Sequence, residues 1–581
     1  MKNVAVTIRR CNLGAGIMIL SAVLVGCGGA EVSKPLEAIT ELPNPFKAIS
    51  ELPNPFEVIN KKFGGKLKTN KKQVFGVLTS DDPAAASVGN SILLNGGSAA
   101  DAASAMAFTM SVTYPSRVGL GGGGVCLVGG GRGGEVKVLE FLPPKSQTKD
   151  RRTDRPSAVP AFVRGIAALH ARHGRMPWRM VVAPARDFAR DGVMITQSFS
   201  DDLEKYARPL FTDPASKAIF TFRDGKAYTV GNRLRQLDLN SVLSTIAGRG
   251  AGEFYNGLLA RRLVEASLSA GGSLNAVELR EYLPQWRDPL SVQIGENVVH
   301  TTPTPTTAGI VAIQMLQLAK IGQRDSSDTP VNRAHLMAEI AKRSIGERTK
   351  WLGRDLGASE NLQTLLAASH TSQMMRTFSH KIASPAKKFV DHDRVPKETN
   401  ANASFIVADG DGLIVNCSLT MYHPFGIGRT TPGLGIMLAA APGGNGRNAL
   451  PLGPIVVTRA SDNATKFAFS GSSGATSATA MANVMIGVLL SKETLVNAVS
   501  KRRLHYDAAN DEIVIEDRDK QDQFESLTAL GHNVRRTSVI GRVNAISCPN
   551  GLPALEPSCN VVADSRSDGL ATKVNFEKEV R

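Results

Sequence analysis

Aromatic side chains are scarce in this sequence, because Phe, Trp and Tyr together make up only 5% of the 581 residues. No stretch interleaves them with Lys or Arg, as a groove for single-stranded nucleic acid does. The formal net charge of +16 is instead spread along the chain. We therefore predict no nucleic-acid partner, and we expect the diffuse positive charge to favour anionic surfaces or acidic ligands.

Long hydrophobic runs are also scarce. The run LGAGIMILSAVLVG near the beginning is too short to span a bilayer comfortably. It follows the basic stretch MKNVAVTIRR, and this order is typical of an export signal. The run ends in Leu24-Val25-Gly26-Cys27, which resembles the bacterial lipobox. We expect residues 1–26 to be a lipoprotein signal peptide and Cys27 to become the lipidated first residue. A plain cleaved signal with an unrelated Cys is the alternative.

A tandem repeat follows the signal, with EAITELPNPF at 37–46 and KAISELPNPF at 47–56. Two copies are too few for a solenoid. The paired prolines force extended backbone and block a continuous helix. We therefore expect residues 27–72 to form a semi-rigid tether that holds a globular part off the membrane. A docking motif for a partner protein is the alternative.

Cysteine is rare, and the usual metal-binding patterns are missing. The sequence has no Cys/His cluster with zinc spacing and no acidic loop of the calcium-hand type, so we predict neither a metal of these kinds nor a cofactor. Cys126 and Cys417 lie in apolar, strand-like runs and are expected to be small core residues. Cys548 and Cys559 flank the loop-like PNGLPALEPS, and in an oxidising compartment we expect them to form a disulfide.

From about Val74 onward, segments with helical and strand periodicity alternate. Residues 83–97 and 98–114 predict two helices, the second beginning at Ser98 and Asp101. Amphipathic helices are expected to fill 155–270. The predicted strands are FGVLTS (75–80), the edge-like EVKVLEF (135–141), FIVAD, LIVNCSLT, GIMLAA, PIVVT, KFAFSG and EIVIE. Two groups of strands between helical layers predict an α+β fold, a four-layer αββα sandwich.

Seven segments carry a specific resemblance. In chain order they are PAAASVGNSILLNGGSAADAASA (83–105), GLGGGG (119–124), GGSLNAVELREYLPQWRDPL (271–290), FGIGRTTPGLGIML (425–438), GSSGA (471–475), RRLHYD (502–507) and LGHNV (530–534). Together they resemble the γ-glutamyltransferase family, also called γ-glutamyltranspeptidases or glutathione hydrolases, from about Phe75 to Ala571. The resemblance implies the fold of the N-terminal-nucleophile hydrolases. It also implies a region like the family's large subunit at 73–397 and one like its small subunit at 398–581, folded as a single globular unit.

The family's precursor cleaves itself before a threonine, whose hydroxyl then attacks a γ-glutamyl amide while its freed amine assists as base. Both steps need a side-chain hydroxyl or thiol at one position. Counting back from Asp409, that position falls on Asn402, which has no hydroxyl, and Ala403 follows where a second Thr is usual. The residues that resemble those before the family's cleavage point are Glu398, Thr399 and Asn400.

The positions that would bind the substrate also depart from the family's pattern. The Arg that binds the substrate's α-carboxylate aligns with Leu142, which cannot make a bidentate, charge-assisted contact. The Asn that precedes the FGxG segment is Tyr422, and an Asn-Asn-Gln run has become Ala439-Ala440-Ala441. In the family, backbone N–H groups at a pair of glycines stabilise the oxyanion. Here that pair is Gly474 and Ala475.

Ser418 and Thr420 match hydroxyl positions beside the family's active site. We interpret them as remnants, with ordinary strand residues as the alternative. The combined losses predict a catalytically degenerate family member, a pseudoenzyme held by a lipid anchor in the bacterial cell envelope and facing the periplasm. Its expected partners are membrane lipid, a small γ-glutamyl-like or other envelope ligand, and an envelope protein.

The alternative is an active hydrolase that uses a displaced nucleophile, Ser404 or Thr399. Ser404 lies on the same side of the predicted strand as Asn402, but a shift of two residues moves the attacking oxygen by roughly 6–7 Å. His335, His423 and His505 are the candidates for acid–base chemistry in such a rebuilt site. A buried, hydrogen-bonded structural role is the expectation for each of these histidines.

Overall fold

The computed structural model describes residues 75–130, 134–146, 156–323, 329–353, 361–395, 401–442, 450–517, 523–553 and 558–575. All of them belong to one compact unit, residues 66–581. The expected signal peptide, the tether and Cys27 lie outside the described residues. So do Glu398, Thr399 and Asn400, and with them the expected boundary between residues 397 and 398.

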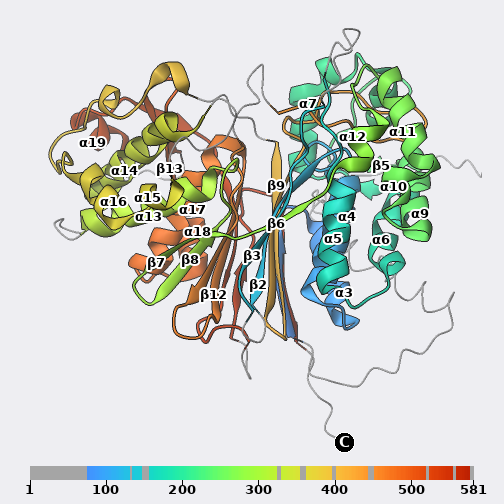
Figure 1. Ribbon diagram of the computed structural model, residues 1–581. Helices are drawn as coiled ribbons and strands as arrows, with labels where there is room; N and C mark the ends of the chain where they lie inside the picture. Colours follow the sequence, from blue (N-terminus) through green and yellow to red (C-terminus); the bar gives the residue numbers. More distant parts are fainter. Residues whose placement is uncertain are drawn as a thin grey trace, which may run out of the picture. The chain divides into compact units, whose positions relative to one another are not determined.

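Two antiparallel sheets lie face to face and form the middle layers of this unit (Figure 1). The seven-stranded sheet has the order β18 (Leu570–Asn575), β1 (Phe75–Ser80), β9 (Asn402–Asp409), β10 (Leu413–Thr420), β2 (Gly123–Gly130), β3 (Lys137–Phe141) and β6 (Gln285–Arg287). The six-stranded sheet has the order β17 (Asn560–Val562), β16 (Arg542–Ser547), β12 (Thr465–Ser472), β11 (Ile455–Arg459), β8 (Asn297–Thr301) and β7 (Leu290–Ile294). Smaller sheets contain β13 (Leu504–Asp507), β14 (Glu512–Glu516) and β15 (Val534–Thr537), and β4 (Val193–Met194) with β5 (Arg233–Leu234).

Helices α3 (Pro83–Leu94), α4 (Ala99–Thr113) and α5 (Phe162–His173) cover the outer face of the seven-stranded sheet. α4 begins where the sequence predicts, because Ser98 and Asp101 form a capping box that satisfies two backbone N–H groups at its start. Its Ala-rich sequence lets it pack closely, and every residue of α4 is buried. The other helices of this half are α6 (Trp178–Asp191), α7 (Gln197–Leu210), α8 (Pro214–Phe220), α9 (Leu237–Arg249), α10 (Glu253–Asn256), α11 (Leu258–Ser269) and α12 (Ala276–Glu281).

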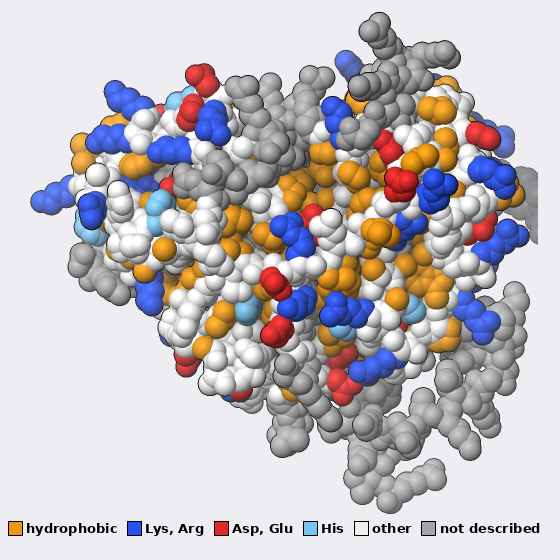
Figure 2. Space-filling view, viewed as in Figure 1, with side chains coloured by type: hydrophobic (Ala, Val, Ile, Leu, Met, Phe, Trp, Pro, Cys, Tyr) orange, Lys and Arg blue, Asp and Glu red, His pale blue; other side chains and the backbone are white. Residues whose placement is uncertain are grey.

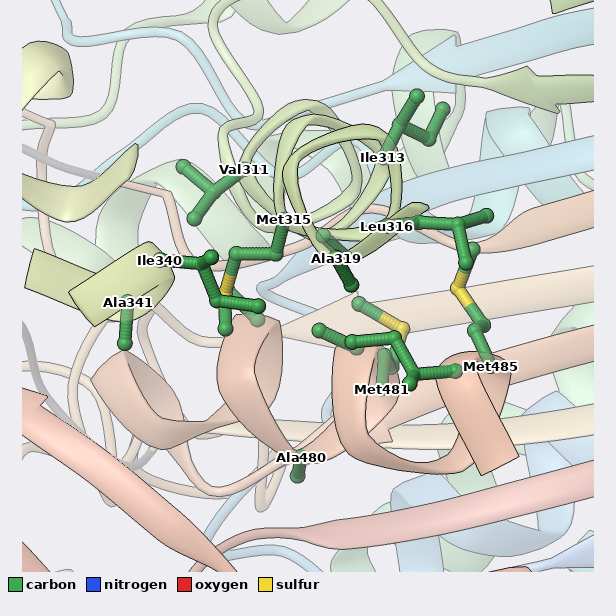
Figure 3. Close-up of a cluster of buried hydrophobic side chains, with 14 of the residues drawn as sticks. Val311, Ile313, Met315, Leu316, Ala319, Ile340, Ala341, Ala480, Met481 and Met485 are labelled. Carbon is green, nitrogen blue, oxygen red and sulfur yellow. The ribbon is translucent and has the colours of Figure 1, made fainter. Parts of the chain in front are cut away.

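Helices α13 (Ala308–Gly322), α17 (Ser477–Met485) and α18 (Leu495–Ser500) cover the six-stranded sheet, and α14 (Pro330–Trp351) packs on α13. Flexible and branched apolar side chains fill this layer. In Figure 3, Met315 of α13 lies beside Ile340 of α14, and Leu316 points toward Met485 of α17. Each such side chain contributes about 1.5–3 kcal/mol by leaving water. The remaining helices here are α15 (Leu362–Leu365), α16 (Ala368–Met375) and α19 (Gln523–Ala529), with short 3₁₀ or π turns at η2 (Ala386–Lys388), η3 (His392–Arg394), η4 (Gly474–Thr476) and η5 (Ile486–Leu490).

The helix–sheet–sheet–helix order confirms the predicted α+β sandwich. Two local predictions are wrong. β3 is an interior strand rather than an edge, because the short β6 pairs with its outer side. The segment GIMLAA forms isolated bridges rather than a strand, since its partners Gly121, Ser157 and Thr430 lie in three different places. Among the described residues, no helix combines the length and the apolar character that crossing a membrane requires.

The glycine run 121–124 has a steric reason. A Cβ placed on Gly123 would lie 2.1 Å from the carbonyl oxygen of Phe141, and one on Gly124 would lie 2.5 Å from that of Ser418. Only glycine therefore allows β2 to approach its two neighbouring strands this closely. The run thus positions β2 between β3 and β10, and β10 in turn pairs with β9.

The prediction for Cys126 and Cys417 as separate core residues is wrong, because they form a disulfide between β2 and β10. The two residues lie directly opposite each other in the strand register, although they are separated by 291 positions in the sequence. The disulfide expected between Cys548 and Cys559 is present. In the described part of the chain, one disulfide thus joins nearby residues and the other joins residues far apart in the sequence.

Candidate functional site

Asn402, which the resemblance assigns to the position of the family's nucleophile, is the first residue of β9 and pairs with Thr420 of β10. It is 1% exposed, and its carboxamide is fully engaged. The side-chain oxygen accepts hydrogen bonds from the backbone N–H groups of Ser473, at 3.2 Å, and Gly474, at 3.0 Å. The side-chain NH₂ donates to the carbonyl oxygen of Gly471 at 3.1 Å. Both polar atoms of this side chain therefore have partners at the end of β12 and in the turn that follows it.

That turn follows β12 and contains two successive residues in the left-handed region, Ser473 (φ 89°) and Gly474 (φ 67°). This backbone conformation points neighbouring N–H groups in one direction and makes a cradle for negative or partially negative oxygen. Gly474 is the position that the sequence identifies with oxyanion stabilisation. Here the cradle holds the neutral carbonyl oxygen of Asn402, so its two donors are already occupied.

The neighbouring hydroxyl groups are also paired within the protein. Thr420 donates to the carbonyl oxygen of Ala401 at 3.0 Å and accepts from the backbone N–H of Tyr422 at 2.9 Å. The Ser418 hydroxyl lies 3.2 Å from that of Ser470 on the facing sheet. These contacts tie strands and sheets together, and they do not direct either hydroxyl toward Asn402.

Arg117 is a residue of this site that sequence reasoning missed. It lies just before the glycine run, is 5% exposed, and makes a bidentate ion pair with Asp202, with Nε–Oδ2 at 2.9 Å and Nη2–Oδ1 at 3.0 Å. Its remaining Nη1 donates to the backbone carbonyl oxygen of Asn402 at 3.4 Å. The signal that could have revealed it is an arginine within an otherwise apolar loop next to the glycines. Arg117 helps to fix the backbone at the beginning of β9.

Ser404, the candidate displaced nucleophile, is completely buried between the two sheets. Its hydroxyl donates to Asp81 Oδ2 at 3.3 Å and accepts from the side-chain amide of Asn544 at 3.0 Å. Burial raises the pKa of the Asp81 carboxyl, against the opposing charge of Arg542. A second hydroxyl, that of Thr79, donates to Asn544 at 2.7 Å. The hydroxyl of Ser404 therefore belongs to a closed polar network that joins β1, β9 and β16.

The residues that the resemblance assigns to substrate binding are buried. Leu142 and Tyr422, 9% and 6% exposed, lie in one hydrophobic cluster, and Ala441 is also buried. Burial raises the pKa of the Tyr422 phenol, and the nearby negative charge of Glu140 adds to this effect. The other members of the cluster are Val125, Ala270, Ile427, Leu438, Ala440, Leu450 and Leu452.

Two cavities lie at other places in the described chain. A cavity of about 10 Å³ lies beside Phe220 and Gln236, and one of about 260 Å³ lies beside His300. Neither is lined by Asn402, Leu142 or Tyr422. Within the described residues, no three His, Cys, Asp or Glu side chains converge in a way that could hold a metal ion.

The three candidate histidines have structural surroundings. His335 is buried and shares a hydrogen bond of 2.8 Å with His532. His505 is buried beside Thr479, at 3.0 Å, and burial lowers its pKa to about 4. His423 is half-buried, with its Nδ1 2.9 Å from the carbonyl oxygen of the residue that follows it. The structure does not bring these rings together around Asn402 or Ser404.

Comparison with known proteins shows the family to which this chain is related. The sequence model described as Gamma-glutamyltranspeptidase matches residues 85–442 and 445–574. The "Glutathione hydrolase proenzyme" of Escherichia coli (strain K12) is 26% identical over 512 residues, which cover 81% of this chain and 88% of that protein. The protein of the same name from Pseudomonas aeruginosa is 29% identical over 382 residues, covering 62% and 67% of the two chains. A crystal structure of cephalosporin acylase from Bacillus halodurans matches the fold with a TM-score of 0.71 at 22% identity, covering 87% of this chain and 98% of that one.

Proposed function

Because this chain belongs to the gamma-glutamyltranspeptidase family, we propose that it is a catalytically degenerate member, one that keeps the N-terminal-nucleophile hydrolase fold without the γ-glutamyl reaction. The observation that carries the proposal is the placement of Asn402. By the resemblance, its carboxamide replaces the hydroxyl that would attack, and it already occupies the backbone N–H of Gly474, one of the two groups assigned to the oxyanion, together with that of Ser473.

The missing chemistry follows from the side chains. An acyl-enzyme requires a nucleophilic oxygen or sulfur at the attacking position, and a neutral carboxamide offers neither. A γ-glutamyl substrate would also have to place its α-carboxylate beside Leu142 and Tyr422, in an apolar cluster. Burying a carboxylate there without a cation is strongly unfavourable. Two independent requirements of the reaction are therefore unmet.

The proposal also includes the location of the protein in the cell. Cys27 would carry a lipid that anchors the chain in the bacterial envelope, and residues 27–72 would tether the folded unit on the periplasmic side. A protein in this position would act by binding, either a small envelope ligand or another envelope protein. The lipobox-like sequence and the proline repeat support this placement.

Electrophoresis of the purified mature protein tests the loss of self-cleavage. The sample must be reduced, because the Cys126–Cys417 disulfide would hold the two fragments together after a break between residues 395 and 402. The expected result is one band of full mature length. Two fragments that divide just before residue 402 would overturn the proposal.

A second assay separates the proposal from a displaced nucleophile. We expect no release of chromophore from a γ-glutamyl anilide above the uncatalysed rate. Turnover that Ser404→Ala abolishes and Asn402→Ala leaves unchanged would establish the alternative, and Thr399→Ala tests the other candidate hydroxyl in the same way. The closed network around Ser404 is the reason that we expect neither outcome.

A further inference from the structure

The cavity of about 260 Å³ lies where the chain passes from one sheet to the other. Asp288 and Pro289 connect β6 of the seven-stranded sheet to β7 of the six-stranded sheet, and both line the cavity. Lys137, at the beginning of β3, lines it as well, whereas Leu142 follows the end of β3. This junction pocket is therefore at the opposite end of β3 from the family's substrate position. On the face shown in Figure 2, acidic, basic and His side chains gather over the middle of the molecule, where β3 and β6 lie in Figure 1.

Three side chains from three adjacent strands form a chain of hydrogen bonds in the wall of the junction pocket, which Asn463 also lines. Nδ1 of His300 on β8 lies 2.8 Å from the hydroxyl of Ser291 on β7, and its Nε2 lies 2.9 Å from the hydroxyl of Thr458 on β11. Ser291 and His300 are directly paired in register, and His300 is also paired with Val456, a residue of the core between the sheets. Side chains two residues apart share a face of a strand, so Thr458 points the same way as Val456.

The positions of the protons on Ser291, His300 and Thr458 decide which hydrogen bonds these side chains can make with a ligand. Burial lowers the pKa of His300 to about 4, so at neutral pH the ring carries one proton and has one acceptor nitrogen. If Ser291 donates to the ring, the ring donates to Thr458, and the Thr458 proton stays available. If the order is reversed, the Ser291 proton stays available. In both tautomers one hydroxyl can donate to a ligand and the other can accept from it.

The rim of the junction pocket is charged but largely compensated. Lys137 Nζ lies 2.9 Å from Glu135 Oε2 and 2.9 Å from Asp288 Oδ1. Both carboxylate side chains are well exposed, at 75% and 84%, so solvent screens the one negative charge that Lys137 leaves unmatched. Val136 and Pro289 add apolar surface to the wall. The pocket therefore combines an uncharged polar interior with some apolar lining.

We propose that the junction pocket binds a small, uncharged, hydroxyl-bearing ligand of about the size of one sugar ring. Hydroxyl groups match an interior that donates and accepts in equal measure, and the C–H faces of a sugar match the apolar wall. The volume suits a small ligand, since pockets for drug-sized molecules begin at about 300 Å³. Binding in the junction pocket does not depend on whether Asn402 has replaced a catalytic residue, because the pocket lining and the hydrogen-bond partners of Asn402 share no residue.

Saturation-transfer NMR on the intact protein tests this proposal with matched probes. Glucose and N-acetylglucosamine are the neutral probes, and glucosamine and glucuronate are the cationic and anionic probes of similar size. We expect saturation transfer to at least one neutral probe and weaker binding of both charged ones. Absence of transfer to both neutral probes, or tighter binding of a charged probe, would overturn the proposal.

Variants then assign the binding to the junction pocket. Thr458→Val and Ser291→Ala each remove one end of the hydroxyl–imidazole–hydroxyl chain and should weaken binding about tenfold, the effect of one lost hydrogen bond. Thr465→Val is the matched control, because the Thr465 hydroxyl on β12 is buried without a hydrogen bond and does not line the cavity. Thermal unfolding confirms that each variant is folded. Binding that is unchanged in both pocket variants would refute the assignment.

Discussion

Replacing Asn402 by Ala is expected to destabilise the protein, although the resemblance assigns this residue to the position of the family's nucleophile. The carboxamide makes three hydrogen bonds of 3.0–3.2 Å at a site that is 1% exposed. Its loss leaves the N–H groups of Ser473 and Gly474 and the carbonyl oxygen of Gly471 without these partners. Asn402 is thus expected to act as a structural residue that satisfies a strained turn.

The magnitude follows from those three bonds. A neutral hydrogen bond contributes about 1 kcal/mol net, and a buried group left without a partner costs about 1–3 kcal/mol. Water that enters the space vacated by the side chain would restore part of this loss. We therefore expect Asn402→Ala to lower the free energy of unfolding by about 3 kcal/mol.

Equilibrium unfolding in urea measures the effect, with Asn95→Ala as the control. The Asn95 side chain bonds a carbonyl oxygen at the exposed end of α3, so its loss should change stability by less than about 0.5 kcal/mol. A change as small as this in Asn402→Ala would refute the reasoning. Asn402→Thr provides a second check, because a hydroxyl introduced at residue 402, with Leu142 unchanged, should still give no γ-glutamyl turnover.

Three further outcomes are expected. Replacing both Cys126 and Cys417 by Ala should lower the free energy of unfolding by about 5–6 kcal/mol through loop-closure entropy. Replacing Cys548 and Cys559, which close an 11-residue loop, should lower it by about 3 kcal/mol. Urea titrations without reductant check this order, and a smaller loss for the Cys126 and Cys417 pair would contradict it. Leu142→Arg should lower the melting temperature through a buried, unpaired charge costing about 3 kcal/mol or more, without creating γ-glutamyl turnover; an unchanged melting temperature would contradict the apolar cluster. The pKa of His505 is lowered to about 4 in the folded state, against about 6.5 in the unfolded state. The neutral His505 ring therefore contributes stability above about pH 6.5, and this contribution is lost as the pH falls toward about 4. The loss amounts to at most about 3 kcal/mol. His505→Gln should therefore flatten the acid side of the stability profile, and an unchanged slope would argue against this residue.

Much of the fold could be predicted because local patterns and tertiary packing agree. The capping box at Ser98 and Asp101 begins α4 as its residue types require, and the predicted strand FIVAD lies within β9. GIMLAA shows the limit of such patterns. Its composition suits a strand, but its backbone finds single partners in separate segments instead of one continuous neighbour. Strand formation needs a partner that the local sequence does not identify.

The candidate site also contains residues that the sequence identified and one that it did not. Residue types alone indicated that Asn402 lacks a hydroxyl and that Leu142 lacks a charge. Arg117 could not be assigned to the site in advance, because its partners are Asp202, in α7, and the backbone of Asn402, both far away in the sequence. A buried ion pair forms only when folding brings two distant residues into contact, and no local pattern in a single sequence indicates which residues these are.

The sequence by itself determined which reactions the side chains can perform, since a carboxamide cannot form an acyl ester in any fold. It also determined the family and the alternation of helices and strands. Only the tertiary structure decided what the substituted residues do instead. The turn after β12 presents its N–H groups to Asn402, and strand register places Cys126 against Cys417. These outcomes depend on distances between remote segments, which the packing of the two sheets fixes.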